Sequence, residues 1–370
     1  MASIEIVGGT WDNVGGKPSK IVKNLTIGIS LSNKFSRVVI NNGGNYEVLS
    51  KVIESKPVPA IADVVVWMPD IPNDLPKLRG IKEIYPKSIL VSSKNNVFTK
   101  YSFQDIVAHG LGLKSNLVLE IGKKHSRFTG RLIDTLGNVW CGRENSFETL
   151  GVAIANRSRD LMDITRQATI QSPERTDEIT QPCMAEGTLE FLEIVKETAE
   201  TFHKLISPAK GTTRFLGNTS FRCNKGFPSM RLENGRIYMS KRNVDKRAID
   251  LNAFVQVGFN AKTDAVWYRG EHKPSVDTIV QVCLYRELSN INYMIHSHVY
   301  EKNAPFTSEM IPCGGLEEID EVLKVISKNY FRGESHFAIN LKGHGSIVFM
   351  NKPHDFEHFE FEARPMPEIM

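Results

Sequence analysis

The sequence lacks the features that mark membrane, secreted and nucleic-acid-binding chains. It has no apolar run long enough to cross a membrane, and residues 1–5 do not begin a basic segment followed by an apolar one. Its 46 Lys and Arg stand against 42 Asp and Glu, and like charges do not gather in a block. We therefore expect a soluble cytoplasmic protein with no nucleic-acid partner and no membrane partner.

Cysteine is also scarce and shows no pairing pattern. The five cysteines form an odd, widely spaced set without a C-x-x-C pair. This spacing argues against a disulfide framework and favours a reducing compartment. We expect free thiols at Cys141, Cys183, Cys223, Cys283 and Cys313.

The composition is that of an ordinary globular protein, on a chain long enough for two domains. Of the 370 residues, 41% are hydrophobic and 24% are charged, which excludes a disordered or fibrous chain. Residues 1–170 alternate short apolar runs with helical patterns, which predicts an α/β, Rossmann-like domain built on a parallel sheet. The predicted strands are residues 4–7, 37–40, 62–68, 88–91 and 117–121.

A polar stretch, residues 171–187, follows this first domain. It contains two prolines and little periodicity, so we interpret it as a linker. The second domain then covers residues 188–370 and opens with apolar residues spaced for one face of a helix.

A glycine-rich loop follows the first predicted strand, at the place where parallel sheets often bind phosphates or nucleotides. Its candidate cofactor-binding residues are Gly8, Gly9, Gly15 and Gly16. The loop does not match the Walker pattern, because both the spacing and the hydroxyl fail, and it does not match G-x-G-x-x-G. A tight turn that serves packing explains the glycines about equally well, so both interpretations stay open.

Three histidines form the main candidate site. His296 and His298 end an apolar run, and His344 lies between two glycines. Residues i and i+2 of a strand point to the same face, so the His-x-His pair places two imidazoles side by side. Three neutral nitrogens without a nearby cysteine indicate a catalytic metal site with an open coordination position, and zinc is the first candidate. A histidine at a strand end is more often a satisfied polar residue, and spacing alone leaves the two interpretations at even odds.

The sequence around these histidines favours the metal site. Six short stretches, spread over roughly residues 188–350, resemble the class II aldolase and adducin family and occur in the family's order. They are Gly217-Asn218-Thr219-Ser220; Asn234-Gly235-Arg236-Ile237-Tyr238-Met239-Ser240 with Val244-Asp245-Lys246; Lys273-Pro274-Ser275; the His-x-His strand; Ile311-Pro312-Cys313; and Gly343-His344-Gly345.

This resemblance implies a fold, an assembly and a metal site. It implies an α/β/α domain around a mostly antiparallel sheet, in a homo-oligomer that is commonly a tetramer. It also implies that His296, His298 and His344 hold Zn²⁺ or another divalent metal, which acts in this family as a Lewis acid and stabilises an enediolate. The family's acidic position for proton transfer falls on Asp277, for which a helix N-cap is the alternative role.

The resemblance also implies substrate-binding residues, with some departures from the family. The matching positions are Asn218, Thr219 and Ser275. Val276 stands where a second serine is usual, and residues 241–243 replace a Pro-Ser-Gly turn with Lys, Arg and Asn. Arg242 in that turn could bind a phosphate or carboxylate through its planar guanidinium, or could be a solvated charge.

Three functions are compatible with these patterns. The leading hypothesis is a zinc-dependent class II aldolase-like enzyme, a lyase or epimerase that acts on a small hydroxylated carbonyl compound or a sugar-derived substrate. The alternatives are a non-catalytic, adducin-like interaction module and a bifunctional enzyme with a nucleotide-binding N-terminal domain. The intact histidine trio favours the enzyme, because a scaffold has no need for three ligands.

Overall fold

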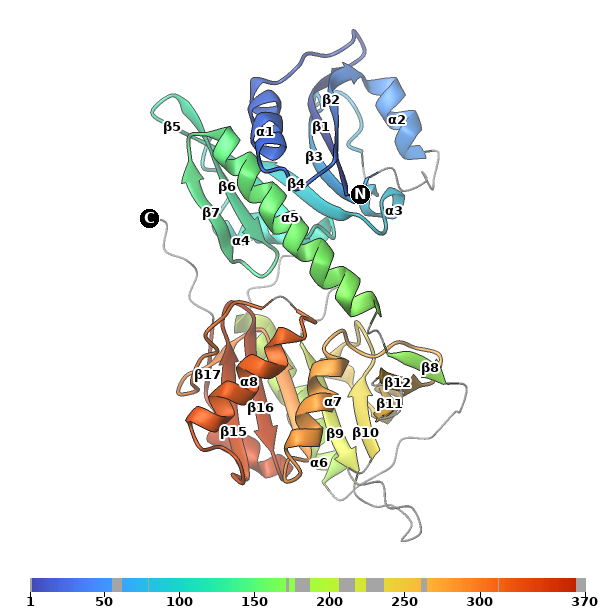
Figure 1. The fold of residues 1–370 in the computed structure, drawn as a ribbon, viewed down its shortest axis with the longest axis vertical. Coiled ribbons are helices and arrows are strands. Elements are labelled where there is room, and N and C mark those ends of the chain that lie inside the picture. The colour runs from blue at the N-terminus through green and yellow to red at the C-terminus, as the bar shows by residue number, and fades with distance from the viewer. Residues whose placement is uncertain are drawn as a thin grey trace. The chain divides into compact units, whose positions relative to one another are not determined.

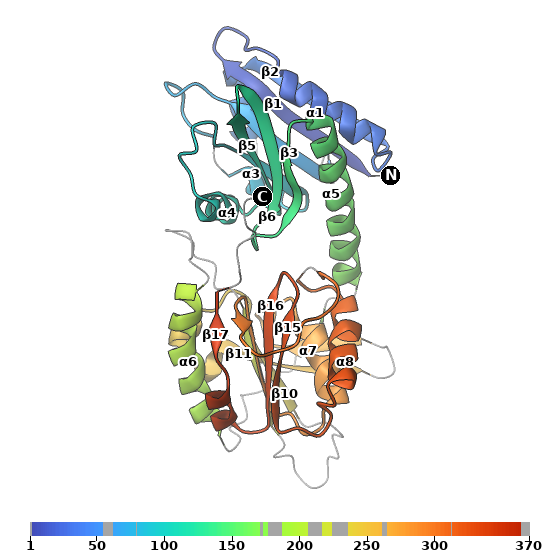
Figure 2. The ribbon, with the colours of Figure 1, turned by 90° about the vertical axis from the view of Figure 1, so that its left-hand side faces the viewer.

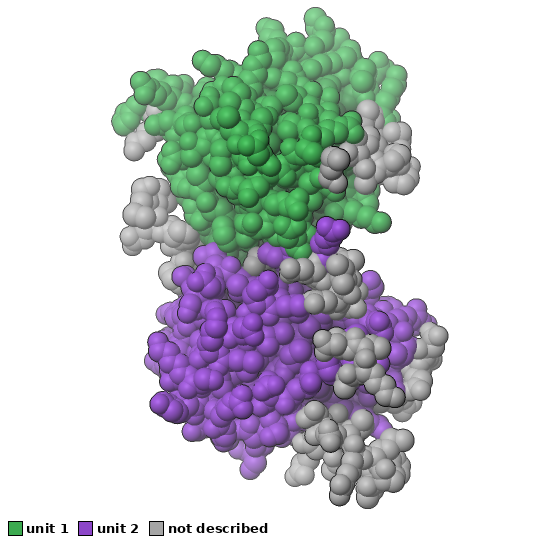
Figure 3. Space-filling view, in the orientation of Figure 1, with its two compact units in different colours: residues 1–163, 209–212, 366–370 green, residues 164–208, 213–365 purple. Residues whose placement is uncertain are grey.

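The chain forms two compact units, Met1–Asp163 and a second unit made mainly of Ile164–Pro208 and Thr213–Pro365 (Figures 1 and 3). The computed structural model describes residues 2–54, 62–78, 80–170, 173–176, 187–205, 217–223, 236–260, 265–311 and 313–363. Of the expected linker, only residues 173–176 and 187 are described, and Glu174–Thr176 form strand β8 of the second unit.

The first unit is built on sheet A, which has seven strands in the described residues. The strand order is β2-β1-β3-β4-β5-β6-β7, and β1 to β5 run parallel. The sheet therefore changes winding direction between β1 and β3, as in doubly wound folds. Its strands are β1 (Ser3–Asp12), β2 (Arg37–Asn45), β3 (Val64–Asp70), β4 (Ile89–Asn95), β5 (Leu117–Lys124), β6 (Arg127–Asp134) and β7 (Val139–Glu144).

The five predicted strands of this domain correspond to β1 to β5. Central strands such as β3 are buried on both faces, which explains why their sequences read as continuous apolar runs. The sheet is not parallel throughout, because β6 and β7 extend it in antiparallel pairing after β5.

Helices cover both faces of sheet A. One apolar core joins the sheet to α1 and α5, and separate clusters join the opposite face to α2, α3 and α4. These helices are α1 (Lys20–Leu31), α2 (Tyr46–Glu54), α3 (Ile81–Ile84), α4 (Phe103–Gly112) and α5 (Phe147–Ile170).

The second unit is built on sheet B, which has eight strands in the described residues. Their order is β15-β16-β13-β9-β10-β11-β12-β8, and every pair except β12 with β8 is antiparallel. The mostly antiparallel sheet is as expected. Its strands are β8, β9 (Asn218–Cys223), β10 (Arg236–Ser240), β11 (Phe254–Asn260), β12 (Ala265–Arg269), β13 (Tyr293–Ser297), β15 (His336–Leu341) and β16 (Gly345–Met350).

The second unit has the expected three layers, helix, sheet and helix. Figure 2 shows α6 on one side of sheet B and α7 with α8 on the other, and a separate apolar core fills each interface. The helices are α6 (Thr188–Leu205), α7 (Thr278–Glu287) and α8 (Glu317–Lys328). Shorter elements are η1 (Lys246–Ala248), η2 (Leu251–Ala253), η3 (Pro353–His358), β14 (Tyr300–Glu301) and β17 (Phe361–Glu362).

The expectation of free thiols is wrong for one cysteine. Cys223, buried in β9, is disulfide-bonded, whereas Cys141, Cys283 and Cys313 form no disulfide bond. Cys183 lies outside the described residues. Sequence spacing cannot reveal a bond whose formation depends on how closely two β-carbons approach in the fold. Cysteine usage therefore gives no argument for a reducing compartment, and the cytoplasmic location stays a prediction.

No helix among the described residues combines the length and the apolar character needed to cross a bilayer.

Candidate active site

The three histidines meet at one end of sheet B. His296 lies in β13, His298 follows that strand, and His344 directly precedes β16, which pairs with β13. All three residues are buried, and their ring centroids are 4.6–5.1 Å apart. One ring nitrogen from each lies within 4.8 Å of the corresponding nitrogen of the other two.

Two glycines allow the strands to approach this closely. A Cβ atom at Gly345 would lie 1.9 Å from the carbonyl oxygen of Ser297, and one at Gly217 would lie 2.4 Å from that of His296. Both glycines also have positive φ angles, which disfavour other residues. Gly345 of the Gly-His-Gly pattern, together with Gly217, is therefore a requirement of strand packing around the site.

Hydrogen bonds fix the orientation of two of the imidazole rings. Nδ1 of His296 lies 3.0 Å from the carbonyl oxygen of Ser346, and Nδ1 of His344 lies 2.9 Å from Oε1 of buried Glu318. A carbonyl oxygen can only accept, so Nδ1 of His296 donates and Nε2 keeps its lone pair. That Nε2 atom is buried and makes no hydrogen bond within the described residues.

The charge state of the site suits a metal ion. Burial, with His344 close by, lowers the pKa of His296 to about 4, so the ring is neutral at physiological pH. Burial raises the pKa of Glu318, and the neighbouring His344 opposes that shift. A neutral imidazole whose second nitrogen is hydrogen-bonded to a carbonyl or carboxylate is the usual environment of a metal-ligating histidine. The residues present therefore fit a divalent metal of the zinc type.

Asp277 stands beside the histidines. It occupies the N-cap position of α7, but its side chain makes no cap hydrogen bond. Instead, Oδ2 accepts a hydrogen bond from Nδ2 of Asn218 at 2.6 Å, and Oδ1 accepts one from the thiol of Cys313 at 3.1 Å. A second group of possible metal ligands includes this carboxylate: one ligand atom each of Asp277, Cys313 and His344 lies within 4.8 Å of the other two. The helix-cap alternative therefore does not describe this carboxylate.

The sequence did not identify Cys313 and Lys246 as residues of the site. Cys313 is exposed as a residue, but desolvation of its sulfur and the nearby Asp277 raise the pKa of the thiol well above its ordinary value, so the sulfur keeps its proton. Lys246 is buried, and burial lowers its pKa to about 8, although the charges of Asp245 and Asp277 oppose the shift. Both residues fall within stretches quoted for the family resemblance, which was the available signal.

The predicted substrate-binding residues divide into an internal pair and a loop pair. Asn218 and Thr219 are buried, and their side chains already have partners, Asp277 for Asn218 and the Met294 carbonyl for Thr219. Arg242 is exposed, and its loop is joined to the Ser275 segment by backbone hydrogen bonds to Lys273 and from Ser275 to Ser240. Substrate binding by all four residues stays a prediction.

The glycine loop of the first unit is organised around its own acid. Oδ1 of Asp12 accepts hydrogen bonds from the backbone nitrogens of Val14, Gly15 and Gly16 at 2.7–3.0 Å. These bonds, above all that from Gly16, lower the pKa of Asp12. In addition, a Cβ atom at Gly8 would lie 2.4 Å from Val22, and one at Gly9 would lie 2.6 Å from the nitrogen of Gly43. The packing role is visible, and cofactor binding by these glycines stays a prediction.

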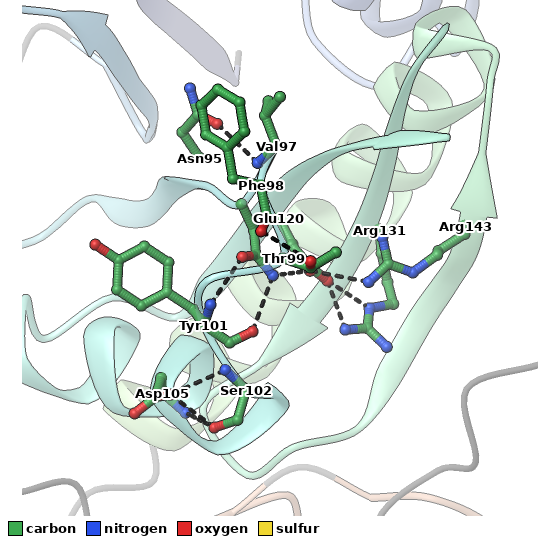
Figure 4. Close-up of polar contacts among 11 residues, drawn as sticks. Asn95, Val97, Phe98, Thr99, Tyr101, Ser102, Asp105, Glu120, Arg131 and Arg143 are labelled. Atoms are coloured by element: carbon green, nitrogen blue, oxygen red, sulfur yellow. Dashed lines mark hydrogen bonds and ion pairs between the residues drawn. The ribbon is translucent and has the colours of Figure 1, made fainter. Parts of the chain in front are cut away.

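The first unit also contains a buried cluster of charged residues (Figure 4). Glu120 of β5 is 1% exposed and accepts hydrogen bonds from Arg131 of β6, Arg143 of β7 and Asn96. The same figure shows that the loop from Asn95 to Ser102 runs beside this cluster. At the end of the loop, the side chains of Ser102 and Asp105 form a capping box at the N-terminus of α4. The polar groups of this cluster are therefore hydrogen-bonded to one another.

Comparison with known proteins finds a family resemblance within the second unit. Residues 196–313 match the family model of the class II aldolase and adducin N-terminal domain. These residues lie mainly in the second unit, which resembles this family over the matched stretch. The match confirms the resemblance over that part of the chain, whereas His344 lies beyond the matched residues. No curated protein matches the sequence.

Three solved structures resemble parts of the chain. An L-fuculose 1-phosphate aldolase is 18% identical, covers 48% of this chain and 84% of its own, and has a TM-score of 0.33. The L-fuculose-1-phosphate aldolase of Thermus thermophilus is 15% identical, with coverages of 44% and 82% and a TM-score of 0.28. A DNA/pantothenate metabolism flavoprotein of Streptococcus pneumoniae is 11% identical, with coverages of 46% and 99% and a TM-score of 0.31. At these scores, nothing about the site rests on the likeness.

Proposed function

We propose that the class II aldolase-like domain is a metal-dependent lyase or epimerase that acts on a small hydroxylated carbonyl compound or a sugar-derived substrate. The proposal rests mainly on one observation. A carboxylate that is not used as a helix cap stands next to three buried imidazoles, and one ring nitrogen of each imidazole lies within 4.8 Å of those of the other two. A scaffold needs neither feature, so the non-catalytic, adducin-like alternative is less well supported.

In this proposal His296, His298 and His344 hold a divalent ion, with Zn²⁺ as the first candidate. When bound, such an ion supplies Lewis-acid polarisation of a carbonyl oxygen. Ser346 and Glu318 hold the Nδ1 protons of His296 and His344, so that the opposite nitrogens keep their lone pairs for the ion.

Asp277 acts as the general base. Each of its oxygens has one internal donor, Asn218 or Cys313, and a carboxylate oxygen can accept a second hydrogen bond. The carboxylate can therefore take a proton from a hydroxyl or carbon next to the substrate carbonyl without losing its support. Arg242 and Ser275, on neighbouring loops, are proposed to bind the polar groups of the substrate.

The resemblance also supports a small-molecule substrate and a homo-oligomer, with a tetramer as the expected assembly. Both remain part of the proposal. The aldol and epimerase reactions share the same first requirement, a positioned base beside a polarised carbonyl, so the residues described here serve either one.

Metal content and turnover test the proposal together. We expect about one divalent ion per chain in the wild type, and almost none after His296→Ala, His298→Ala or His344→Ala, because two ligands hold an ion poorly. His125→Ala is the matched control, since that histidine is exposed and belongs to the first unit. Elemental analysis and a retro-aldol assay on phosphorylated and unphosphorylated hydroxy-carbonyl compounds provide the measurements. Equal metal content in all variants would contradict the site, and metal binding without any turnover would favour the interaction module.

A further inference from the structure

Two rows of polar side chains face each other between α7 and β9, in a layer that is otherwise apolar. On the helix they are Asp277, Gln281 and Tyr285, spaced four residues apart and therefore on one face. On the strand they are Asn218 and Ser220, spaced two apart and therefore also on one face. None of the five is more than 5% exposed.

These side chains form a continuous hydrogen-bonded ladder. The hydroxyls of Tyr285 and Ser220 are 3.0 Å apart, and Ser220 donates to Oε1 of Gln281 at 2.5 Å. Nε2 of Gln281 donates to Oδ1 of Asn218 at 2.5 Å, and Nδ2 of Asn218 donates to Oδ2 of Asp277 at 2.6 Å. The ladder thus leads from the core of the unit to the carboxylate beside the histidines.

The donor and the acceptor of each hydrogen bond in the ladder are determined by the bond before it. An ionised carboxylate only accepts, so Asn218 must present its NH₂ group to Asp277, which leaves its carbonyl toward Gln281. Gln281 must then present its own NH₂ group to Asn218, and its carbonyl accepts the proton of Ser220. The hydroxyl of Ser220 has only that one proton, so the Tyr285 hydroxyl donates to Ser220. Turning either amide round would place two acceptors against each other inside the core, which is unfavourable.

We propose that Gln281 is a positioning residue, which locks the amide of Asn218 so that Asn218 holds the Asp277 carboxylate in its working orientation. This inference rests on the proposed function, in which Asp277 is the base. Because Asp277 makes no cap hydrogen bond to its own helix, its direction depends on partners from elsewhere in the unit. Among the described residues, the side-chain amide of Gln281 is hydrogen-bonded to Asn218 and not to the Asp277 carboxylate, so it acts on that carboxylate through Asn218.

Two substitutions at position 281 separate positioning from simple packing. Gln281→Met keeps the approximate volume but removes both amide contacts. Gln281→Glu keeps the shape but presents an acceptor to Asn218, which favours a reversed Asn218 amide. We expect both variants to bind metal as the wild type does and to lower kcat by roughly 10²-fold with little change in KM, since a misplaced catalytic group costs about that much. Gln256→Met is the matched control, because Gln256 is also a buried glutamine of this unit but lies outside the ladder.

A double variant and a structural readout make the test decisive. Residues that act as a unit are not additive, so Gln281→Met should lower kcat no further in an Asp277→Asn background. A purely structural role would instead reduce the fraction of folded protein in every background, and would leave kcat per metal-loaded site unchanged. The second readout is solvent exchange of the Asn218 side-chain amide, followed by NMR with isotope-labelled asparagine. We expect slow exchange in the wild type and in Gln256→Met, and faster exchange in Gln281→Met.

The outcomes distinguish this inference from the proposed function. Wild-type kcat in Gln281→Met, with Asp277→Asn inactive, would overturn the positioning role and leave the proposed function standing. If the wild type or Asp277→Asn contradicts the proposed function, the exchange experiment still decides the structural claim. Unchanged protection of the Asn218 amide in Gln281→Met overturns that claim, and lost protection supports it.

Discussion

Glu120 in the first unit and Asp277 in the second are both buried carboxylates, and their hydrogen-bond partners differ in charge. Glu120 of the first unit is bonded to the guanidinium groups of Arg131 and Arg143 and to Asn96. Asp277 of the second unit is held by an amide and a thiol, which are neutral donors. The hydrogen bonds to Glu120 therefore come from two cations, whereas those given for Asp277 come from neutral groups, with the charge of Lys246 acting from nearby. Burial alone therefore does not identify a catalytic acid or base, and the type of partner is more informative.

The largest effect should follow from removing the charge of Asp277. Asp277→Asn keeps the size of the side chain but removes its ability to accept a proton, so we expect kcat to fall by about 10²–10⁴-fold. Metal content and melting temperature should stay close to those of the wild type. Steady-state kinetics and elemental analysis of the same preparation provide the check, and near wild-type turnover would remove Asp277 from the mechanism.

The corresponding change in the first unit should affect stability and leave the chemistry intact. Glu120→Gln leaves Arg131 buried without its counter-charge, which costs about 3–5 kcal/mol. We expect a lower midpoint in chemical or thermal unfolding, and an unchanged kcat per folded molecule at a permissive temperature. Glu83→Gln is the control, because its ion pair with Lys114 is exposed and should contribute less than about 1 kcal/mol. A loss of kcat in Glu120→Gln under native conditions would show that the two clusters are not separate in function.

A smaller effect is expected from the acid behind His344. Glu318→Gln can still accept a hydrogen bond from Nδ1 but no longer provides a carboxylate, and such changes typically weaken metal binding about 10–100-fold. Titration with a chelator measures the affinity. Glu317→Gln, at the neighbouring exposed position, is the matched control and should bind metal as the wild type does.

The effect with the narrowest range of conditions, confined to alkaline pH, should be a change in the pH dependence of stability. Burial lowers the pKa of Lys246 to about 8 from an ordinary value of 10.5, so the unfolded chain binds more protons between these values. The contribution of Lys246 to the free energy of unfolding should therefore rise as pH increases from about 8 to about 10.5, and its charged form destabilises the fold below that window. Lys246→Met should remove this rise. Arg247→Met is the control, since the pKa of Arg247 is raised and its charge does not change in the window.

The sequence predicted most of the architecture. The strands of the first unit were recognisable because parallel strands covered on both faces are continuous apolar runs. The antiparallel ends of sheet A were not, since the direction in which β6 pairs with β5 depends on contacts that no local pattern records. In the second unit, the resemblance rather than periodicity predicted the layers.

The sequence predicted the candidate site only where a short motif carried it. His296 and His298 are neighbours on one strand, so their proximity follows from strand geometry. Glu318 and Gln281 were missed because their roles depend on where α8 and α7 pack. The signal for Gln281 was present in the spacing of Asp277, Gln281 and Tyr285, three polar residues on one face of a helix that is otherwise largely buried. A stripe of this kind on a core helix indicates a buried polar partner on the facing element.

Gly345 links the assembly of the three histidines to the folding of sheet B. Because any side chain there would strike the Ser297 carbonyl, β13 and β16 reach their register only with glycine at this position. The same pairing brings His344 to His296 and His298, inside a unit whose two apolar cores lie on either side of the sheet. Zinc fingers, by contrast, need their ion in order to fold. Here the folding of the sheet brings the ligands together before an ion binds. The free energy of ion binding would therefore contribute to the affinity for the ion and would not be needed to fold the unit.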